Sequence, residues 1–189
     1  VNYEIDNVGP IVWANYGSDL YDFPILVNLT AYDNVDENPS IFYTLNGSDP
    51  KIYGVRYNNP FTISSTTTLK FYTKDITNHK SDVVIVNYIF AHIGNLNTGK
   101  GFNSIQSAIN DVDTVSGNVI KVKPGVYNEN IVISKSIALV GDVNGSVILK
   151  GVNSNNPVIG ITKNANNTLI YGLKITDSNF GIVVLESNN

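Results

Sequence analysis

The chain has 189 residues, with 12 Lys and Arg against 16 Asp and Glu, and a formal net charge of −4 at pH 7. It is long enough for one medium or two small domains with cores of their own, whereas the mild acidity and the scattered basic residues argue against a nucleic-acid-binding protein. The absence of cysteine excludes disulfides, thiolate metal sites and a cysteine nucleophile, and no apolar run is long enough to span a bilayer as a helix.

The composition is typical of an all-β protein. Asn is the commonest residue, with 28 copies, and Asn and Ser favour turns because their short side chains hydrogen-bond to the local backbone. Ile, Val, Tyr and Thr are abundant as well and suit a pleated strand surface. Methionine is absent even at position 1, so we expect the sequence to be a piece of a longer or processed polypeptide.

Charge and glycine content divide the chain into two halves. Residues 1–90 carry 5 basic and 10 acidic side chains, whereas residues 91–189 carry 7 and 6. The break falls in residues 91–101, which contain three glycines and no hydrophobic periodicity. We therefore expect one domain at residues 7–90, a linker at residues 91–101 and a second domain at residues 102–189.

Seven short strands separated by polar turns are predicted in the first domain. They cover residues 11–15, 25–32, 40–45, 52–56, 61–63, 68–74 and 83–90. Residues 68–74 show the alternation of apolar and polar side chains that is expected for a strand with one buried face. Short strands with frequent turns indicate an antiparallel sandwich.

The beginning of the chain is similar to the end of the first domain. Val1–Ile5 (VNYEI) resembles Val86–Phe90 (VNYIF), which lies in the last predicted strand of that domain. We therefore expect residues 1–6 to be the end strand of a preceding module, and the parent protein to carry such modules in tandem.

Four segments of the first domain, taken in order, resemble a known family. They are Ile41–Pro50 (IFYTLNGSDP), Tyr57–Ile63 (YNNPFTI), Thr66–Phe71 (TTTLKF) and Asp75–Ser81 (DITNHKS). Roughly over residues 9–90, the chain is similar to the immunoglobulin-like domain found beside chitobiases and other surface glycosidases. The resemblance implies an immunoglobulin-like β-sandwich that acts as a spacer or presentation module and contributes no catalytic residues. Asn46 stands where the pattern usually has Asp, which affects only the turn.

A short amphipathic helix is predicted at the start of the second domain. Its apolar stripe consists of Ile105, Ala108, Ile109 and Val112. Asn103 and Gln106, three residues apart, can form a capping box at its first turn.

Strands with a recurrent spacing follow the helix. They are predicted at residues 118–124, 131–133, 137–140, 147–149, 158–161, 169–175 and 181–185. Apolar triplets recur after 21 residues from Ile137 to Val158, 24 from Val158 to Ile182 and 22 from Val147 to Leu169. A period of this size in an all-β segment indicates stacked coils, as in a parallel β-helix or solenoid.

The second domain also resembles a known family. Ser104–Ile109 (SIQSAI), Pro124–Ile133 (PGVYNENIVI) and Lys135–Gly141 (KSIALVG) are similar to the start of right-handed β-helices of the pectinesterase and pectate lyase superfamily. Over residues 102–189, the resemblance implies an N-terminal cap helix and the first coils of a right-handed parallel β-helix that continues in the parent. Sandwich modules beside such a β-helix are similar to the adhesin-like surface proteins of methanogenic archaea, which are large secreted proteins held at the cell envelope.

No residue of the second domain is assigned a catalytic role. The enzymatic relatives carry acids, Arg or Lys on central coils, whereas the acidic side chains here form no recognisable pair. They are Asp111, Asp113, Glu129, Asp142, Asp177 and Glu186. Glu129 follows the cap motif and is expected at a corner, and His79 and His92 lack partners at metal-ligand spacing and are expected at the surface.

Two surface features suggest ligands. Asp33, Asp36 and Glu37 crowd one turn and could supply hard oxygen ligands for Ca²⁺, although the EF-hand spacing is missing and a solvated acidic turn is the alternative. Trp13 and Tyr16 could stack on sugar rings together with the nearby Tyr21 and Phe23, whereas the alternative is that these rings cover the core or an edge of the sandwich.

Glycosylation candidates are the sequon residues Asn28, Asn46, Asn144 and Asn166, of which Asn46 and Asn166 lie in predicted turns.

Together these features predict an extracellular, non-catalytic structural protein of the cell surface, such as an adhesin-like stalk or a surface-layer component. The expected partners are cell-envelope components or polysaccharide, and neighbouring modules of the same parent chain. The main alternative is the non-catalytic end of a secreted polysaccharide lyase or esterase, and a viral fibre is a third. A chain that ended at Asn189 would leave Ile182, Val184 and Leu185 poorly covered.

Overall fold

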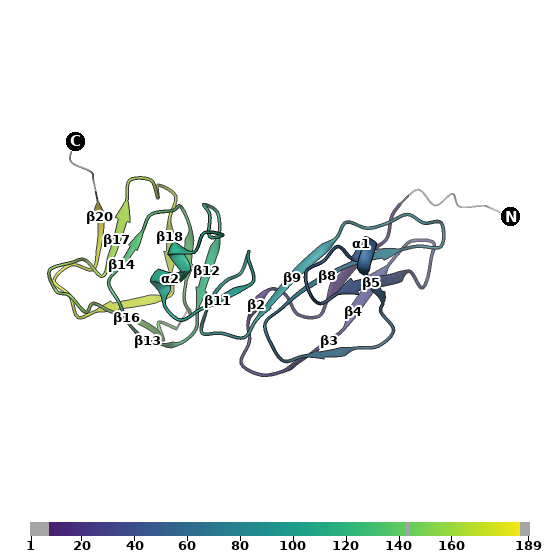
Figure 1. The fold of residues 1–189 in the computed structure, drawn as a ribbon, viewed down its shortest axis with the longest axis horizontal. Coiled ribbons are helices and arrows are strands. Elements are labelled where there is room, and N and C mark those ends of the chain that lie inside the picture. Colours follow the sequence, from purple (N-terminus) through teal and green to yellow (C-terminus); the bar gives the residue numbers. More distant parts are fainter. Residues whose placement is uncertain (1–7, 143, 186–189) are drawn as a thin grey trace. The chain divides into compact units, whose positions relative to one another are not determined.

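The computed structural model describes residues 8–142 and 144–185, so the strand expected at residues 1–6 lies outside the described part of the chain. The chain forms two compact units with the boundary between Tyr88 and Ile89. Each unit consists mainly of short strands and has one short helix, so the protein is all-β (Figure 1). Within the described residues, no helix is long and apolar enough to span a membrane.

The first unit is an antiparallel arrangement consistent with an immunoglobulin-like sandwich. Its elements are β1 (Ile11–Ala14), β2 (Asp19–Leu20), β3 (Ile25–Val27), β4 (Leu29–Tyr32), β5 (Ser40–Thr44), α1 (Pro50–Tyr53), β6 (Val55–Arg56), β7 (Phe61–Ile63), β8 (Thr67–Lys74) and β9 (Val84–Ile89). One sheet has the order β2-β9-β8-β5-β6, and β1–β4 and β3–β7 form two smaller sheets. Strand β5 pairs antiparallel with both β6 and β8, and the pairs β8–β9, β1–β4 and β3–β7 are antiparallel as well.

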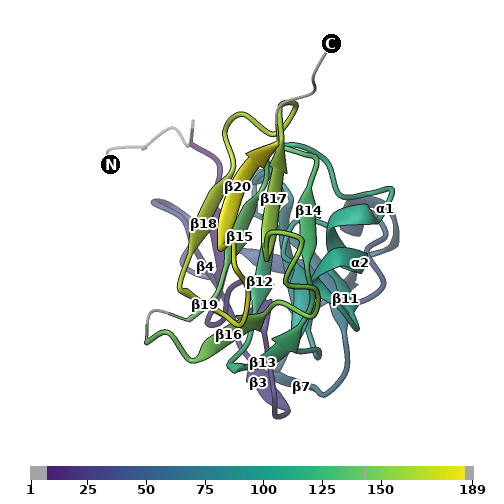
Figure 2. The ribbon, with the colours of Figure 1, turned by 90° about the vertical axis from the view of Figure 1, so that its left-hand side faces the viewer.

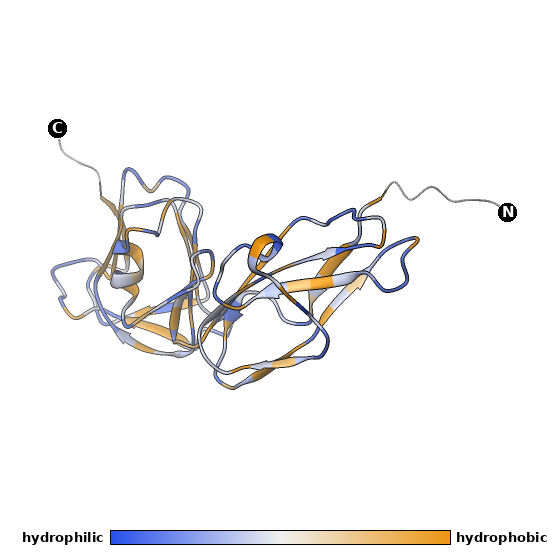
Figure 3. Cartoon of the chain, turned by 45° about the vertical axis from the view of Figure 1, so that its right-hand side comes forward, coloured by the Kyte–Doolittle hydropathy of each residue, from blue (hydrophilic) through white to orange (hydrophobic). Residues whose placement is uncertain are grey.

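Side chains from β3, β8 and β9 supply much of the core of the first unit. Val27, Leu69, Phe71 and Tyr88 are fully buried, and burying each such side chain stabilises the fold by about 1.5–3 kcal/mol. Along β8, Leu69, Phe71 and Thr73 are buried at alternate positions, as the sequence pattern predicts, but Tyr72 on the opposite face is buried as well. Figure 3 shows the same division, with apolar residues concentrated in the strands and hydrophilic residues in most connecting loops.

The strand predicted at residues 52–56 is wrong over most of its length. Residues Pro50–Tyr53 form the helical turn α1, and only Val55–Arg56 form a strand, β6. The turn forms because the Asp49 side chain caps it, accepting a hydrogen bond from the Lys51 backbone N–H at 2.8 Å. Pro50, at the first helical position, has a φ that suits the helix and lacks the N–H that would otherwise be unpaired.

The strand predicted at residues 25–32 is divided into β3 and β4. Asn28 lies between the two pieces, and its backbone N–H donates to the side-chain oxygen of Asn15 at 2.8 Å while its carbonyl accepts from the Asn15 N–H at 3.1 Å. The two pieces then pair with different strands, β7 and β1. An apolar pattern is compatible with one long strand or two short ones, so the break could not be predicted from it.

The second unit contains strands that alternate among three parallel ladders. Its elements are β10 (Ile93–Asn95), β11 (Lys100–Phe102), α2 (Ile105–Asn110), β12 (Val119–Val122), β13 (Gly125–Asn128), β14 (Ile131–Ile133), β15 (Ala138–Val140), β16 (Val147–Lys150), β17 (Ile159–Thr162), β18 (Leu169–Tyr171), β19 (Leu173–Thr176) and β20 (Ile182–Leu185). The ladders are β12-β15-β18, β13-β16-β19 and β14-β17-β20, and Figure 2 shows the strands of the last ladder side by side. Strand β10 extends the first ladder and pairs antiparallel with both β11 and β12.

Apolar side chains stack along these ladders. Leu139 in β15 pairs with Ile120 in β12, the preceding strand of the ladder, and with Ile170 in β18, the following strand. Ile159 in β17 likewise pairs with Ile131 in β14 and with Ile182 in β20. Ile120, Ile131, Leu139 and Ile159 are fully buried, so each ladder places its apolar residues in the common core of the unit.

The spacings predicted from the sequence match this register only in part. Val158 and Ile182 are one residue from the true pair, in which Ile159 faces Ile182. The other two spacings do not join neighbouring residues of a ladder. Val147 pairs with Leu173 and not with Leu169. The Ile137 carbonyl accepts from the Leu169 N–H, whereas the Val158 carbonyl accepts from the Ile131 N–H. The loops between strands differ in length, so equal distances along the sequence do not correspond to equal positions in successive strands of a ladder.

Helix α2 is present but is shorter than predicted and is capped differently. It ends at Asn110, and Val112 lies beyond it with 87% of its surface exposed. The capping box is formed by Ser104 and Ser107, not by Asn103 and Gln106, because the Ser104 and Ser107 side chains each bond the backbone N–H of the other. The expected linker at residues 91–101 is also not irregular, since it contains β10 and the start of β11.

Candidate functional site

Among the described residues, direct ring contacts join only part of the predicted aromatic platform. Tyr16 contacts Tyr21 edge-on at 6.2 Å, and Tyr21 in turn lies 5.6 Å from the ring of the buried Tyr88. In the described part of the chain, no ring contact joins Trp13 or Phe23 to this group. Trp13 and Tyr16 are both partly exposed, at 45% and 42%, so each remains accessible by itself. The sugar-stacking role of Trp13 and Tyr16 stays a prediction.

The Tyr21 side chain gives a test of this packing. Burial first, and then the nearby Asp19 and Tyr16, raise the pKa of Tyr21 to about 12. An unfolded tyrosine ionises near a pKa of about 10, so above that pH the unfolded chain loses a proton that the folded unit keeps. The free energy of unfolding therefore falls as the pH rises from about 10 towards 12.

We expect the melting temperature of the protein to fall across this alkaline range, and to fall less steeply in Tyr21→Phe. Thermal melts followed by circular dichroism between about pH 8 and 11 measure both slopes. Tyr32→Phe, at an exposed ring in the same unit, is the matched control and should keep the wild-type slope. The same slope in Tyr21→Phe as in the wild type would show that Tyr21 does not cause the effect.

The acidic turn is held by hydrogen bonds within the chain. One carboxylate oxygen of Asp33 accepts from the backbone N–H groups of Val35 and Asp36 at 3.0 and 2.8 Å, while its other oxygen is buried without a partner. Asp36 accepts from the Ile76 N–H at 2.9 Å, and Glu37 is exposed. Among the described residues, no group of three or more His, Asp or Glu side chains could hold a metal ion. The calcium site thus gains no support from the geometry and stays a prediction.

All four sequon asparagines are exposed. They are Asn28, Asn46, Asn144 and Asn166. Asn28 accepts a hydrogen bond from the Tyr57 hydroxyl at 2.6 Å, whereas Asn166 lies in a turn between β17 and β18, as predicted. The side-chain oxygen of Asn46 accepts from the backbone N–H and the hydroxyl of Ser48, at 3.1 and 2.7 Å. Each sequon is therefore accessible, and glycosylation stays a prediction.

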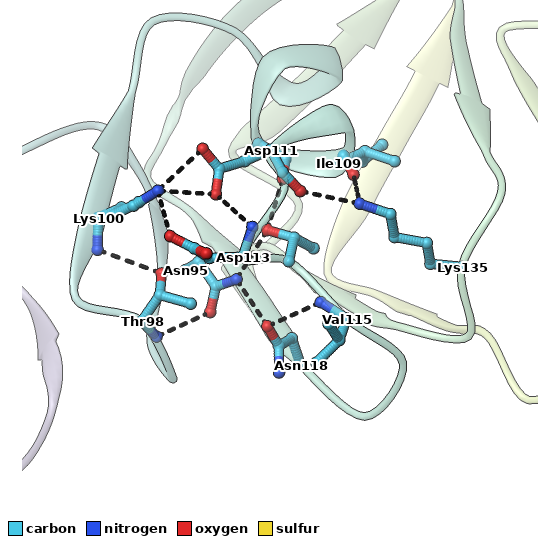
Figure 4. A network of polar contacts seen from close by, with 11 residues as sticks. Asn95, Thr98, Lys100, Ile109, Asp111, Asp113, Val115, Asn118 and Lys135 are labelled. Atoms are coloured by element: carbon cyan, nitrogen blue, oxygen red, sulfur yellow. Dashed lines mark hydrogen bonds and ion pairs between the residues drawn. The ribbon is translucent and has the colours of Figure 1, made fainter.

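An ion-pair cluster lies beside the C-terminus of α2 (Figure 4). The Lys100 Nζ lies 3.0 Å from Asp111 Oδ1 and 2.6 Å from Asp113 Oδ2. Hydrogen bonds to Asp113 and Asp111 raise the pKa of Lys100, and the bond from Lys100 lowers the pKa of Asp111. A carboxyl group that acts as a general acid needs a raised pKa. The cluster is therefore suited to holding charged groups in place, and Lys135 completes it by donating to the Ile109 and Asp111 carbonyls at 2.9 Å.

A buried asparagine lies next to this cluster. Asn95 in β10 has no exposed surface, and its amide nitrogen donates to Thr114 Oγ1 and Asn118 Oδ1, both at 2.9 Å. Its side-chain oxygen accepts from the backbone N–H groups of Asn97 and Thr98. All four hydrogen-bonding positions of the amide are used, so the residue ties β10 to the loop that follows α2.

The remaining acidic and histidine side chains are distributed over separate places. Glu129 caps α2, because its two carboxylate oxygens accept from the backbone N–H groups of Ile105 and Gln106 at 3.0 Å. Asp142 accepts from Ser146 Oγ, and Asp177 pairs with Lys150. His79 lies 3.1 Å from Asp75, His92 is exposed, and Glu186 lies outside the described residues. These side chains are not brought together into a common site.

A pocket of about 600 Å³ opens on the first unit, beside α1 and the end of β5. Its lining includes Tyr43, Leu45, Asn46, Ser48, Tyr53 and Val55. Among these residues, only Asn46 was given a functional role from the sequence, as a glycosylation candidate. The clue that was available is that tyrosines flank the polar turn at residues 46–49 on both sides, but it is the helical turn α1 that places Tyr53 next to β5.

The two units define an all-β protein in which an immunoglobulin-like arrangement is followed by parallel ladders. Residues 17–85 match the family described as the chitobiase/beta-hexosaminidase C-terminal domain. A relative named cell surface glycoprotein, from the archaeon Methanothermus fervidus, is 46% identical over 92 residues, which are 49% of this chain and 15% of that protein. The chain thus spans about 15% of the length of this relative. No solved structure matches the chain. Together, the domain match and the relative support a location at the cell surface.

Proposed function

We propose that the chain is a non-catalytic structural module of a cell-surface protein, part of an adhesin-like stalk attached to the envelope. In this proposal the second unit is the beginning of a right-handed parallel β-helix, and the first unit is a spacer of the immunoglobulin-like class. The partners are other modules of the parent chain and glycan-containing components of the envelope.

The observation that carries the proposal is the in-register pairing of the three parallel ladders. Apart from the antiparallel pairs that β10 makes with β11 and β12, each described strand of the second unit pairs in parallel with the neighbouring strands of its own ladder, as in β14, β17 and β20. Repeated stacking of this kind adds length without requiring contacts between distant parts of the sequence. Right-handed connections between parallel strands of one sheet are nearly universal, which favours the right-handed form.

The charges of the second unit support the same proposal. Asp111, Asp113 and Asp177 are paired with lysines, and Glu129 serves as a helix cap. A polysaccharide lyase or esterase needs acidic or basic side chains that converge on a substrate, and the described carboxylates are used in separate structural contacts. In addition, a similar segment occurs in the relative named cell surface glycoprotein.

Sugar release is the property that separates this proposal from an enzyme. The purified chain is incubated with a panel of insoluble polysaccharides and envelope preparations, and reducing and unsaturated sugars are measured in the supernatant while bound protein is measured in the pellet. We expect no release above a heat-denatured control with any substrate, and retention on envelope material. Release of sugar by the folded chain, absent from the denatured control, would overturn the structural role.

A further inference from the structure

We propose that the pocket beside α1 and β5 binds a neutral pyranose ring, at a place distinct from Trp13 and Tyr16. This inference goes beyond the structural role, because a spacer needs no ligand. It rests on four properties of the pocket: a fixed aromatic wall, an exposed aromatic ring, polar groups at the rim and a lining without formal charge.

The wall of the pocket is rigid because Tyr43 belongs to a cluster of three rings. The Tyr43 ring stacks on Phe61, with 4.7 Å between the ring centroids and 11° between the planes. Tyr57 meets both rings edge-on, at 6.3 Å from Tyr43 and 6.2 Å from Phe61. Stacked and edge-to-face ring pairs stabilise one another beyond the area that they bury. The wall therefore exists before any ligand arrives and need not be ordered on binding.

Tyr53 supplies a ring that is free to stack on a ligand. It is the last residue of α1, and its backbone N–H is held by the Asp49 carbonyl at 2.9 Å. The backbone is closely packed at the end of this turn, because a Cβ on Gly54 would lie 2.2 Å from the Pro50 carbonyl oxygen. The Tyr53 side chain is nevertheless 69% exposed. A fixed backbone that presents an exposed ring is the arrangement needed to bind the apolar face of a sugar.

Hydrogen-bonding groups lie at the rim. The Asn46 oxygen is held by the backbone N–H and hydroxyl of Ser48, which fixes the orientation of the amide because the backbone N–H can only donate. Among the described residues, nothing bonds to the Asn46 amide nitrogen. Thr44 keeps the turn in place by donating from its hydroxyl to the Ser48 carbonyl at 2.8 Å. The two amide hydrogens of Asn46 are thus available to the hydroxyl oxygens of a ligand.

The charge and size of the pocket define the class of ligand. All lining residues are uncharged, so anionic or cationic ligands would gain no ion pair there. The volume of about 600 Å³ lies within the range of about 300–1,000 Å³ that small-molecule sites occupy. A ligand with one apolar face for Tyr53 and hydroxyls for Asn46 is a neutral pyranose. Two sources could supply it: a separate glycan chain, or a glycan attached to Asn46 itself.

The test for a separate glycan is an NMR titration of the unglycosylated chain. The probes are methyl β-glucoside, cellobiose and N,N′-diacetylchitobiose, with galacturonic acid and sorbitol as the charged and the acyclic comparison. We expect saturable shifts of the Asn46, Gly47, Ser48 and Tyr53 amides with at least one neutral pyranose, and none with the two comparison compounds. Tyr53→Ala should weaken binding about tenfold, as truncation of a dominant contact residue does.

Two control variants make this result specific to the pocket. Tyr32→Ala removes a similarly exposed tyrosine of the same unit, and Trp13→Ala removes the candidate ring that the sequence suggested. Both should bind the probe as the wild type does. All three positions are exposed, so the variants should keep the wild-type spectrum, and this is checked before titration. Loss of binding in Trp13→Ala with full binding in Tyr53→Ala would overturn the assignment to the pocket.

The second arm tests the attached source. The chain is produced in a host that glycosylates sequons, and contacts between the sugar on Asn46 and the Tyr53 ring are sought by NMR, with Asn46→Gln as the variant that cannot carry the glycan. Binding of free sugar supports a separate glycan, and sugar–Tyr53 contacts support the attached one. Absence of both would overturn the proposal while leaving the structural role intact, because the sugar-release assay does not depend on this pocket.

Discussion

Gly172→Ala is expected to lower the free energy of unfolding of the second unit by at least about 3 kcal/mol. Gly172 has a φ of +70°, a conformation that costs an alanine about 1–2 kcal/mol. A Cβ at this position would also lie 2.7 Å from the carbonyl oxygen of Asp142, which follows β15. The substitution therefore combines backbone strain with a clash against the backbone of the turn at residues 141–142.

Two further glycines separate the two causes. Gly145 has a φ of +64° but open space around it, so Gly145→Ala should cost only the conformational strain of about 1–2 kcal/mol. Gly141 lacks the positive φ, but a Cβ there would lie 2.3 Å from the Gly172 carbonyl oxygen, so Gly141→Ala reports the clash. Urea denaturation followed by circular dichroism measures all three. If Gly145→Ala and Gly172→Ala lowered the free energy of unfolding equally, the backbone at Gly172 would not approach Gly141 and Asp142 as described.

Asn95→Ala is expected to destabilise the second unit by about 2–4 kcal/mol. The substitution removes two donated and two accepted hydrogen bonds from a side chain with no exposed surface. Asn95→Asp should be about as damaging at neutral pH, because a carboxylate cannot donate to Thr114 or Asn118 and would carry a buried charge.

The matched control is Asn167→Ala, an exposed asparagine in a turn of the same unit, which should change the free energy of unfolding by less than about 0.5 kcal/mol. The three variants are compared by the same urea denaturation. If Asn95→Ala were as mild as Asn167→Ala, the buried amide would not be the tie between β10 and the loop after α2.

Much of the fold could be predicted from local patterns. The alternation in residues 68–74 predicts the buried face of β8, and the helical stripe at Ile105, Ala108 and Ile109 predicts α2, because both depend on side-chain period alone. What could not be predicted depends on contacts between distant residues. The pairing of Ala138 with Leu169 follows from the lengths of the intervening loops, which hydrophobic spacing does not encode.

The candidate sites show the same division. The sequence left open whether Trp13 lies at the surface or covers the sandwich, and the structure leaves it 45% exposed at the third position of β1. The pocket was missed since it depends on α1, a turn that the sequence pattern assigned to a strand. Glu129, expected at a corner, caps α2 from 23 or 24 residues away, a role that only the folded chain defines.

The central claim, that this chain is a structural module displayed on the cell envelope, is tested most directly by labelling intact cells of the source organism. Antibodies are raised against the folded chain and applied before and after the cells are opened. The account predicts full labelling of intact cells, with no increase on opening and with the label retained in isolated envelopes. Labelling that requires opened cells, or protein found free in the culture medium and absent from envelopes, would contradict it.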